Sequence, residues 1–194
     1  LSDQPILVLT ETGILTALEI LFTSSSEIYG LTSDNRQDEI MPINLSTSSP
    51  RACYSEGKRI AETLISTFSK VYDLEVRIAR VFNTYGPGEN LNYLKKGMVS
   101  IYCSYVWKKK PIIVKGSLNR FRNYQFIDDV VNILILSLKN KQLNKNEIIN
   151  LSNSEYTTVK NLIKKILRLN YFKKYKIIKK ASTKGDSFGY NASN

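Results

Sequence analysis

The sequence predicts an α/β fold in which a parallel, doubly wound sheet is joined to a smaller C-terminal lobe. Short apolar runs typical of buried strands alternate with amphipathic helical segments along most of the chain, and this alternation favours a parallel sheet. Clusters of turn-forming residues follow two of these runs, at 24–26 and 83–88. A chain of 194 residues with 42% hydrophobic content suffices for one sizeable core, or for a core plus a small lobe.

The first half of the chain contains the two strands whose ends are expected to form a ligand site. Residues 20–23 are a short apolar run that ends in three serines, and residues 74–82 place apolar side chains at alternate positions before the turn cluster at 83–88. Apolar residues recur every three or four positions over 54–70, which predicts one long amphipathic helix. A further helix is predicted over 5–19. Doubly wound sheets bind ligands at the carboxyl ends of their strands, where both clusters are expected.

The second half continues the alternation of helices and strands. We expect the last helix to be capped at its N-terminus by Thr157 or Thr158, whose hydroxyls can accept from the first free backbone N–H groups. The predicted elements are a helix over 98–108, a strand over 112–115, a helix over 128–139, a strand over 148–151, a helix ending near 169, and a loose tail over 185–194.

Composition narrows the chemistry that is open to the chain. It contains no histidine, the usual acid–base residue and the commonest member of serine triads and zinc sites, so proton transfer must use Tyr, Lys, Asp, Glu or Cys, and no metal site is expected. Cys53 and Cys103 cannot build a disulfide framework, which favours the reducing cytoplasm. No apolar run reaches membrane-spanning length and residues 1–10 lack the features of a signal peptide, so no membrane partner is expected.

The formal net charge of +11 raises nucleic acid as a partner. The excess lies largely within 160–184, among Asn and Ile and without interleaved Arg and aromatic residues, so we expect no specific nucleic-acid binding. A solvated, lysine-biased helical face accounts for the same composition. The positive field can also help to attract a doubly charged diphosphate substrate.

A tyrosine and a lysine four residues apart on a helix share one face, where the ammonium lowers the pKa of the phenol and prepares it for proton transfer. The pattern Tyr-x-x-x-Lys begins at four positions, namely Tyr54, Tyr105, Tyr156 and Tyr175, so the pattern by itself does not identify a site. Only the pair Tyr54 and Lys58 begins a long amphipathic helix and follows a strand that ends in hydroxyl residues. We therefore select this pair.

Three segments, in the same order and at the same spacing, resemble successive motifs of the NAD-dependent epimerase/dehydratase family, the extended short-chain dehydrogenases/reductases. The resemblance implies a Rossmann-like sheet, NAD as cofactor and a UDP-sugar or related nucleotide sugar as substrate. A fourth segment, 116–130, is similar to a further family segment. The three motifs are Thr23-Ser24-Ser25-Ser26-Glu27-Ile28-Tyr29-Gly30, Pro50-Arg51-Ala52-Cys53-Tyr54-Ser55-Glu56-Gly57-Lys58-Arg59 and Arg80-Val81-Phe82-Asn83-Thr84-Tyr85-Gly86-Pro87.

The resemblance implies a role for each matching residue. Ser25 would hydrogen-bond the sugar 4-hydroxyl, and Tyr54 would remove its proton while hydride leaves C4 for the nicotinamide. Lys58 would hold the nicotinamide ribose and lower the pKa of Tyr54. Asn83 would contact the substrate diphosphate region, and Arg122 would pair with phosphate or lie near a sugar acid.

The residues after Ser25 discriminate among the reactions of the family. Sugar 4,6-dehydratases carry an Asp-Glu pair here, in which the Asp protonates the departing C6 oxygen. Ser26 occupies the Asp position, and a hydroxyl is too weak an acid for that step, so dehydration is disfavoured. The pair of Ser26 and Glu27 is most similar to UDP-glucuronate decarboxylases, which form UDP-xylose. Residues 97–130 look at least as similar to nucleotide-sugar 4-epimerases such as UDP-glucose 4-epimerase, and this alternative stays open.

Two departures from the family pattern bear on activity. The sequence has no glycine-rich fingerprint for the NAD pyrophosphate, which indicates that most of the NAD-binding half is absent. Glu19 passes directly into the strand at 20–23, where relatives have a connecting loop, and this deletion is expected to disturb the sheet. We expect residues 1–85 to be the C-terminal part of the Rossmann-like domain with the catalytic residues.

Residues 86–194 are expected to form mainly the nucleotide-sugar lobe, with 117–151 returning to the sheet. The missing fingerprint also admits a non-catalytic remnant that keeps the substrate lobe and a dimer-forming helix pair, so a homodimer is a further expectation. A basic C-terminal module for nucleic acid or an anionic surface is the third alternative, opposed by its poor Arg and aromatic content.

Overall fold

The computed structural model describes residues 19–30, 36–41, 44–49, 52–94, 97–140, 146–170, 175–183, 188–189 and 191–192. The predicted helix over 5–19 lies outside these residues except for Glu19, which begins a strand rather than ending a helix. The elements are β1 (Glu19–Ser25), the 3₁₀-helix η1 (Ser26–Tyr29), β2 (Arg36–Gln37), α1 (Ala52–Tyr72), β3 (Glu75–Val81), β4 (Asn83–Tyr85), α2 (Met98–Trp107), β5 (Ile112–Lys115), β6 (Phe121–Phe126), α3 (Ile127–Lys139), β7 (Glu147–Leu151), β8 (Tyr156–Thr158), α4 (Val159–Leu169), β9 (Ile177–Lys180) and β10 (Asn191–Ala192).

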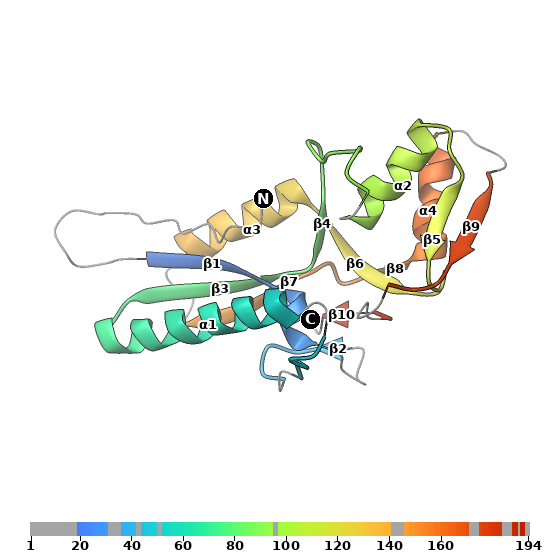
Figure 1. Cartoon of the computed structure of the whole chain (residues 1–194). Helices are drawn as coiled ribbons and strands as arrows, with labels where there is room; N and C mark the ends of the chain where they lie inside the picture. The colour runs from blue at the N-terminus through green and yellow to red at the C-terminus, as the bar shows by residue number, and fades with distance from the viewer. Residues whose placement is uncertain are drawn as a thin grey trace.

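The central sheet has the strand order β1-β3-β7, and both pairings are parallel. Helix α1 covers one face and α3 the other (Figure 1). Alternate residues of β3 point to opposite faces, so Val76 and Ile78 pack in the cluster with α1, whereas Ala79 packs against Val130 of α3. Because helices cover both faces, β3 is buried along most of its length. The predicted doubly wound α/β fold is confirmed, and the sheet forms although β1 starts directly at Glu19.

The C-terminal lobe has a separate core at the other end of the molecule (Figure 1). Helices α2 and α4 pack on each other and on β5, which pairs in parallel with β9. The buried residues of this core are Tyr102, Val106, Ile112, Val114, Val159, Leu162, Ile163 and Ile166. Of the two capping candidates, Thr158 is the N-cap of α4, and its side chain accepts from the Asn161 N–H at 3.1 Å.

The sheet β4-β6-β8 joins the two parts, and two of its strands correct the sequence-based expectations. The turn cluster at 83–88 begins with β4, which pairs in parallel with β6. Strand β6 was not predicted because its buried residues include Arg122, Asn123 and Gln125, so it lacks an apolar alternation. The buried amide side chains form hydrogen bonds with backbone carbonyls. Asn123 donates to Asn153 O, and Gln125 donates to Leu151 O.

Residues 188–189 and 191–192 are packed against the rest of the fold, where the sequence predicts a loose tail over 185–194. Strand β10 pairs with β2, and Ala192 is buried with Ile28 and Tyr29. Gly189 bridges to Phe121, and a side chain at this glycine would collide with the Phe121 ring. The expectation of a loose tail is therefore wrong for the described residues of this segment. They are held by pairing with distant parts of the chain, which leaves no pattern in the local sequence. In the described part of the chain, no helix combines the length and apolarity needed to cross a bilayer.

Candidate functional site

The two predicted clusters lie at the same edge of the central sheet. In the register of β1 and β3, Ser25 pairs with Val81, so the carboxyl ends of both strands are level. Helix η1 follows β1 directly, and β4 follows β3 after one residue. The backbone turns sharply after η1, at Gly30. Glycine is favoured at this position because its φ is 68° and a Cβ would collide with the Asn44 carbonyl. This edge is where doubly wound sheets place their ligands.

Of the three serines at the end of β1, only Ser25 reaches the surface. Ser24 and Ser26 are 4% and 5% exposed, whereas Ser25 is partly exposed. Ser25 is the N-cap of η1, and its Oγ accepts from the Glu27 N–H at 3.2 Å. Accepting that bond leaves the hydroxyl proton for donation. The structure thus presents Ser25, and neither neighbour, as an accessible hydroxyl at this edge.

Tyr54 and Lys58 lie in the first two turns of α1, which packs on β1, β3 and η1. The Lys58 Nζ donates to the Thr23 carbonyl at 2.9 Å, and it lies 5.1 Å from the centroid of the Phe22 ring. The same nitrogen lies 6.0 Å from the centroid of the Tyr54 ring. The ammonium is therefore held between the end of β1 and the tyrosine one helical turn before it.

The other three Tyr-x-x-x-Lys patterns do not place both residues on one helix. Lys109 lies beyond the end of α2 with a φ of 51°. The pattern at Tyr156 starts in β8, and the pattern at Tyr175 runs into β9. Only Tyr54 and Lys58 meet the condition of a shared helical face, as the sequence context indicated.

The remaining predicted residues lie at different distances along this edge. Glu27 is in η1, directly after the serines, and Asn83 is the exposed first residue of β4. Arg122 is buried in β6, two residues before Tyr124, the register partner of Asn83. Its Nη1 donates to Phe121 O at 2.7 Å and to Phe188 O at 3.1 Å. Ser25, Glu27, Tyr54 and Lys58 are thus grouped at the end of β1, Asn83 follows the neighbouring strand, and Arg122 lies one strand further on.

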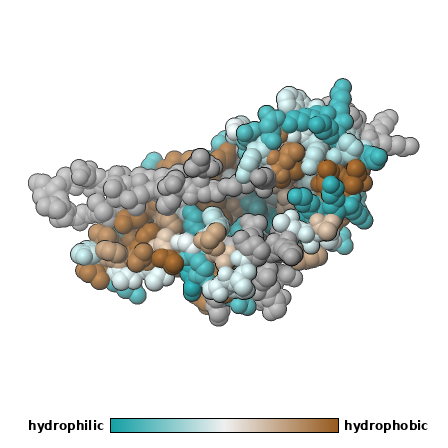
Figure 2. Space-filling view, viewed as in Figure 1, coloured by the Kyte–Doolittle hydropathy of each residue, from teal (hydrophilic) through white to brown (hydrophobic). Residues whose placement is uncertain are grey.

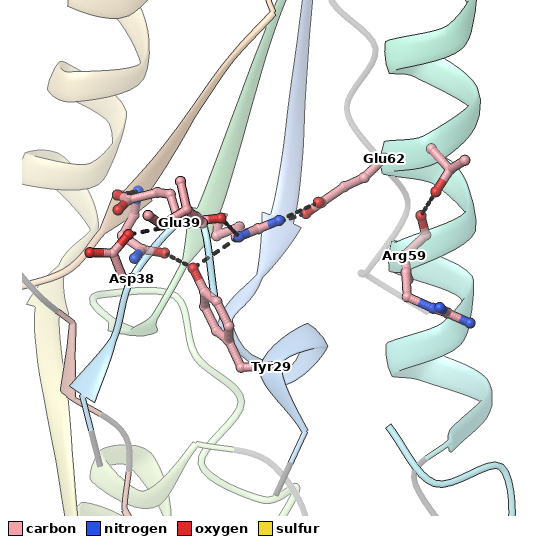
Figure 3. Close-up of polar contacts among 9 residues, drawn as sticks. Tyr29, Asp38, Glu39, Arg59 and Glu62 are labelled. Atoms are coloured by element: carbon pink, nitrogen blue, oxygen red, sulfur yellow. Dashed lines mark hydrogen bonds and ion pairs between the residues drawn. The ribbon is translucent and has the colours of Figure 1, made fainter. Parts of the chain in front are cut away.

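A buried network beneath this edge was not predicted. Arg80 of β3 forms a bidentate pair with Glu62 of α1, at 3.2 and 2.9 Å, and both side chains are buried. Its Nη1 also donates to Tyr29 OH at 3.0 Å, and Tyr29 donates to Asn150 Oδ1 of β7 at 2.7 Å. Figure 3 shows Tyr29 and Glu62 reaching the same guanidinium from different sides.

The network shifts the ionisation of two members. Burial raises the pKa of Tyr29, although hydrogen bonds from Arg80 and to Asn150 act to lower it. Burial acts to lower the pKa of Arg80, but the hydrogen bond and the charge of Glu62 outweigh it and the pKa is raised. The sequence signal for Arg80 was a charge at the alternate positions of the strand that also hold Val76 and Ile78, whereas Glu62 lies outside the apolar stripe predicted for the helix and gave no such signal.

A cavity of about 700 Å³ opens beside the site, between β4 and the starts of α2 and α3. Its volume lies in the range of small-molecule pockets. It contains none of Ser25, Tyr54 or Lys58, and its lining begins one residue after Asn83. Gly86 is required here because a side chain would collide with Ile127. The lining residues are Thr84, Tyr85, Gly86, Pro87, Gly88, Glu89, Asn90, Tyr93, Ser100 and Ile127.

Comparisons of sequence give consistent relatives. UDP-glucuronic acid decarboxylase 1 of Danio rerio is 36% identical over 140 residues, which cover 72% of this chain and 32% of that protein. UDP-glucuronic acid decarboxylase 6 of Arabidopsis thaliana is 35% identical over 152 residues, covering 75% of this chain and 43% of that protein. The chain thus spans less than half the length of these relatives.

Solved structures show the same fold at low identity. UDP-N-acetylglucosamine 4-epimerase of Methanobrevibacter ruminantium superposes with a TM-score of 0.82 at 20% identity, covering 90% of this chain and 54% of that one. UDP-glucuronic acid 4-epimerase of Bacillus cereus, in complex with UDP-glucuronic acid and NAD, gives a TM-score of 0.79 at 20% identity, covering 93% and 54%. The model of the family described as GDP-mannose 4,6 dehydratase matches residues 6–187. The chain therefore belongs to this family, which is of the NAD-dependent epimerase/dehydratase type.

Proposed function

We propose that this chain provides the acid–base and substrate-binding part of an NAD-dependent nucleotide-sugar enzyme that acts through a transient 4-keto sugar. The observation that carries the proposal is the position of Lys58, held at the carboxyl end of β1 beside Tyr54 and next to the accessible Ser25. UDP-glucuronate decarboxylation, which yields UDP-xylose, is the reaction we favour. The similarity to UDP-glucuronic acid decarboxylases over most of the chain supports this choice.

Each residue has a chemical task in this proposal. Tyr54 removes the proton of the sugar 4-hydroxyl, and the ammonium of Lys58 favours the phenolate that this step requires. Ser25 hydrogen-bonds the same hydroxyl and orients it. Bound NAD would accept hydride from C4. Tyr54 and Lys58 fit the nicotinamide–ribose end of NAD, whereas the printed sequence supplies no glycine-rich turn for its pyrophosphate.

The surroundings of Ser25 bear on the type of reaction. Ser26 stands where a dehydratase needs an acid for the C6 oxygen, and its burial at 5% exposure supports excluding that step. Glu27 is partly exposed in η1, and we assign it to the catalytic group. Asn83 is exposed and suits a contact with the substrate diphosphate. We assign Arg122 to a phosphate contact, although it is buried and its Nη1 already donates to two backbone carbonyls.

The second candidate is a nucleotide-sugar 4-epimerase. The fold similarity to two 4-epimerases favours it, and both reactions share the first oxidation at C4. The fate of the 4-keto sugar separates them, because only a decarboxylase releases carbon dioxide before hydride returns. A product assay therefore decides between them.

The test is to incubate the protein with UDP-glucuronate and NAD and to identify the products by mass spectrometry. UDP-xylose supports the favoured reaction, and the 4-epimer at unchanged mass supports the alternative. If neither product nor a 4-keto sugar forms, while calorimetry shows that UDP-glucuronate binds, the chain is a non-catalytic remnant of the substrate lobe. If UDP-glucuronate does not bind either, the proposed substrate class is wrong.

Tyr54→Phe tests the assignment of the base. We expect turnover to fall by about 10²–10⁴-fold, since general-base catalysis supplies that much, while UDP-glucuronate binding persists. Tyr105→Phe is the matched control, because Tyr105 belongs to another Tyr-x-x-x-Lys pattern and lies on α2 in the other lobe. Equal turnover in the two variants would remove Tyr54 from the mechanism.

Two finer assignments complete the proposal. The first is a homodimer that forms through α1, whose residues Ile60, Leu64 and Phe68 recur at helical spacing and are exposed. Figure 2 shows hydrophobic side chains over α1. An apolar stripe over three turns of one helix suits the same stripe of a second copy, since isologous contacts pair like surfaces. Light scattering should give a dimer for the wild type and for Thr63→Glu, and a monomer for Leu64→Glu; a monomeric wild type would refute the dimer.

The second finer assignment is the cytoplasm. Cys53 and Cys103 are both free thiols, Cys53 exposed and Cys103 partly buried, and such thiols persist in a reducing compartment. Cell fractionation with an antibody against the chain tests this assignment. Recovery from an oxidising compartment would contradict it.

A further inference from the structure

One end of the C-terminal lobe brings together the ends of two helices and the starts of two strands. Helix α2 leads into β5 and α4 leads into β9, and the parallel register of Ile112 with Ile177 places both strand starts side by side. The Tyr175 hydroxyl oxygen lies 2.9 Å from the backbone carbonyl oxygens of both Tyr105 and Lys110, and its single proton is shared between these acceptors, which links the two connections. We call this end, made up of residues 105–112, 168–170 and 175–177, the lobe tip.

The lobe tip exposes large apolar side chains that the core does not use. Trp107 is 70% exposed and Leu169 is 78% exposed, and each ends its helix. Their neighbours Val106 and Ile166 already fill the core, so burial within the lobe does not account for these two side chains. Ile177 is also exposed, at the start of β9. Exposed apolar side chains that gather at one place and are bordered by polar residues mark an interaction surface, and these three side chains all belong to the lobe tip.

The same end is uniformly basic. Residues 98–115 and 159–180 contain lysine and arginine but neither Asp nor Glu. Four exposed cations lie within three residues of these apolar side chains in the sequence. The four are Lys109, Lys110, Arg168 and Lys176.

We propose that the lobe tip adsorbs to the surface of a bilayer that contains anionic lipids. Trp107 and Leu169 enter the boundary between headgroups and acyl chains, and the flanking lysines face the lipid phosphates. Trp is enriched at this boundary because its ring is amphipathic, and lysines beside it add electrostatic attraction to anionic lipids. The sequence predicts no membrane partner because it lacks an apolar run of spanning length. Adsorption to a bilayer surface does not require such a run, so that prediction applies only to spanning segments.

The observations favour a bilayer over a nucleic acid. The lobe tip has a single arginine and exposes aliphatic Leu169 and Ile177, which neither stack on bases nor pair with phosphates. An aliphatic and an indole side chain surrounded by lysines suits lipid instead. The lobe tip lies in a different part of the fold from Ser25, Tyr54 and Lys58, so this inference does not depend on the proposed reaction.

Trp107 makes the test direct, because it is the only tryptophan of the chain. The full chain is mixed with vesicles of phosphatidylcholine alone, or of equal parts phosphatidylcholine and phosphatidylglycerol, and bound protein and tryptophan emission are measured. We expect binding to the anionic vesicles only, a shift of emission to shorter wavelength, and weaker binding as salt is added.

Two sets of charge variants with the same net charge locate the contact. Replacing Lys109, Lys110 and Lys176 by Gln should lower the partition coefficient roughly 100-fold, because each lysine near an anionic surface contributes about fivefold. Replacing Lys70, Lys139 and Lys160 by Gln should lower it less than about fivefold, since these exposed residues lie away from the lobe tip. Leu169→Ser should lower it about tenfold and, because the side chain is exposed, leave the fold unchanged.

Four outcomes would overturn the proposal. These are no binding to anionic vesicles, binding without any change in tryptophan emission, equal losses in the two lysine triples, and tighter binding to an oligonucleotide with the same tryptophan response. The last outcome would assign the lobe tip to nucleic acid. Circular dichroism of every variant confirms that the fold is retained.

Discussion

At the scale of single residues, the pair formed by Arg80 and Glu62 links the segments that carry the candidate site. Glu62 lies one helical turn after Lys58 on α1, Arg80 lies three residues before Asn83, and the Tyr29 hydroxyl joins them from the end of η1. A buried pair of this kind adds little net stability over apolar residues, but removing one partner leaves an uncompensated charge. The network therefore makes the relative positions of α1, η1 and β3 sensitive to one guanidinium.

Glu62→Gln tests this sensitivity. We expect the free energy of unfolding to fall by about 3 kcal/mol, because the Arg80 charge stays buried without its counterion. Urea unfolding followed by circular dichroism measures the loss. Glu56→Gln on the same helix is the control, since its pair with Arg59 at 2.6 Å is partly exposed and is worth less than about 1 kcal/mol. If both variants lost the same free energy of unfolding, the buried network would contribute no more to stability than the surface pair.

Tyr29→Phe tests the ionisation of the network. Burial raises the Tyr29 pKa above 10.0, so the fold favours the neutral phenol. The neutral Tyr29 hydroxyl therefore contributes to the free energy of unfolding. This contribution is fully present below the pKa of the unfolded state, about 10, and is lost as the pH rises through the higher pKa of the folded state. The variant should lose about 1–3 kcal/mol at neutral pH, from the broken hydrogen bonds, but should decline less steeply than the wild type above about pH 10. Parallel declines in urea unfolding would contradict this account.

At the scale of elements, helix ends show where local chemistry decides the structure. Helix α4 begins where Thr158 caps it, and its apolar positions Leu162, Ile163 and Ile166 face the lobe core. Helix α1 begins at Ala52 and packs on η1, β1 and β3. The tyrosine–lysine geometry of the site therefore depends on packing as well as on helical periodicity.

Thr158→Ala should destabilise the protein by about 1 kcal/mol, because the Asn161 N–H loses its side-chain acceptor. Thr158→Ser keeps an acceptor at the same position and should remain within a few tenths of a kcal/mol of the wild type. Urea unfolding compares the two variants. A loss of the same size with serine would assign the effect to the threonine methyl group and not to the cap.

At the scale of the whole molecule, two hydrophobic cores lie at opposite ends of the chain fold. One packs α1 and α3 on the central sheet, and the other packs α2, α4 and β5 in the C-terminal lobe. The sheet β4-β6-β8 joins them through backbone pairing, amide hydrogen bonds and the aromatic contacts of Tyr85 with Phe126 and of Phe121 with Tyr156. Because the buried apolar residues of the two ends form separate clusters, we expect the two ends to open separately.

Ile163→Ala tests separate opening, because Ile163 is buried in the lobe core. The cavity should cost about 2–5 kcal/mol, and hydrogen exchange should accelerate in β5 and α4 while β3 amides keep their protection. Mass spectrometry of peptides from exchanged protein measures this directly. Ile78→Ala in the central core is the matched control and should give the reverse pattern. Uniform acceleration in both variants would show one cooperative unit.

Features that depend on periodicity and on local hydrogen bonding could be predicted from the order of the amino acids. The helices at 52–72, 98–107, 127–139 and 159–169, and the strands at 19–25, 75–81, 112–115 and 147–151, follow apolar patterns that were predicted to within a few residues. The Thr158 cap and the shared face of Tyr54 and Lys58 follow from helical geometry. The parallel, doubly wound arrangement follows from the alternation of these elements.

Features that depend on partners far apart in the chain could be identified only from the folded arrangement. Strand β6 is stable because Asn123 and Gln125 find carbonyls some thirty residues away, and β10 is stable because it pairs with β2. The Arg80 network draws on β3, α1, η1 and β7, and the lobe tip on residues separated by about seventy positions. A local pattern cannot specify such partners, because the free energy of a buried polar group depends on which acceptor the fold brings to it.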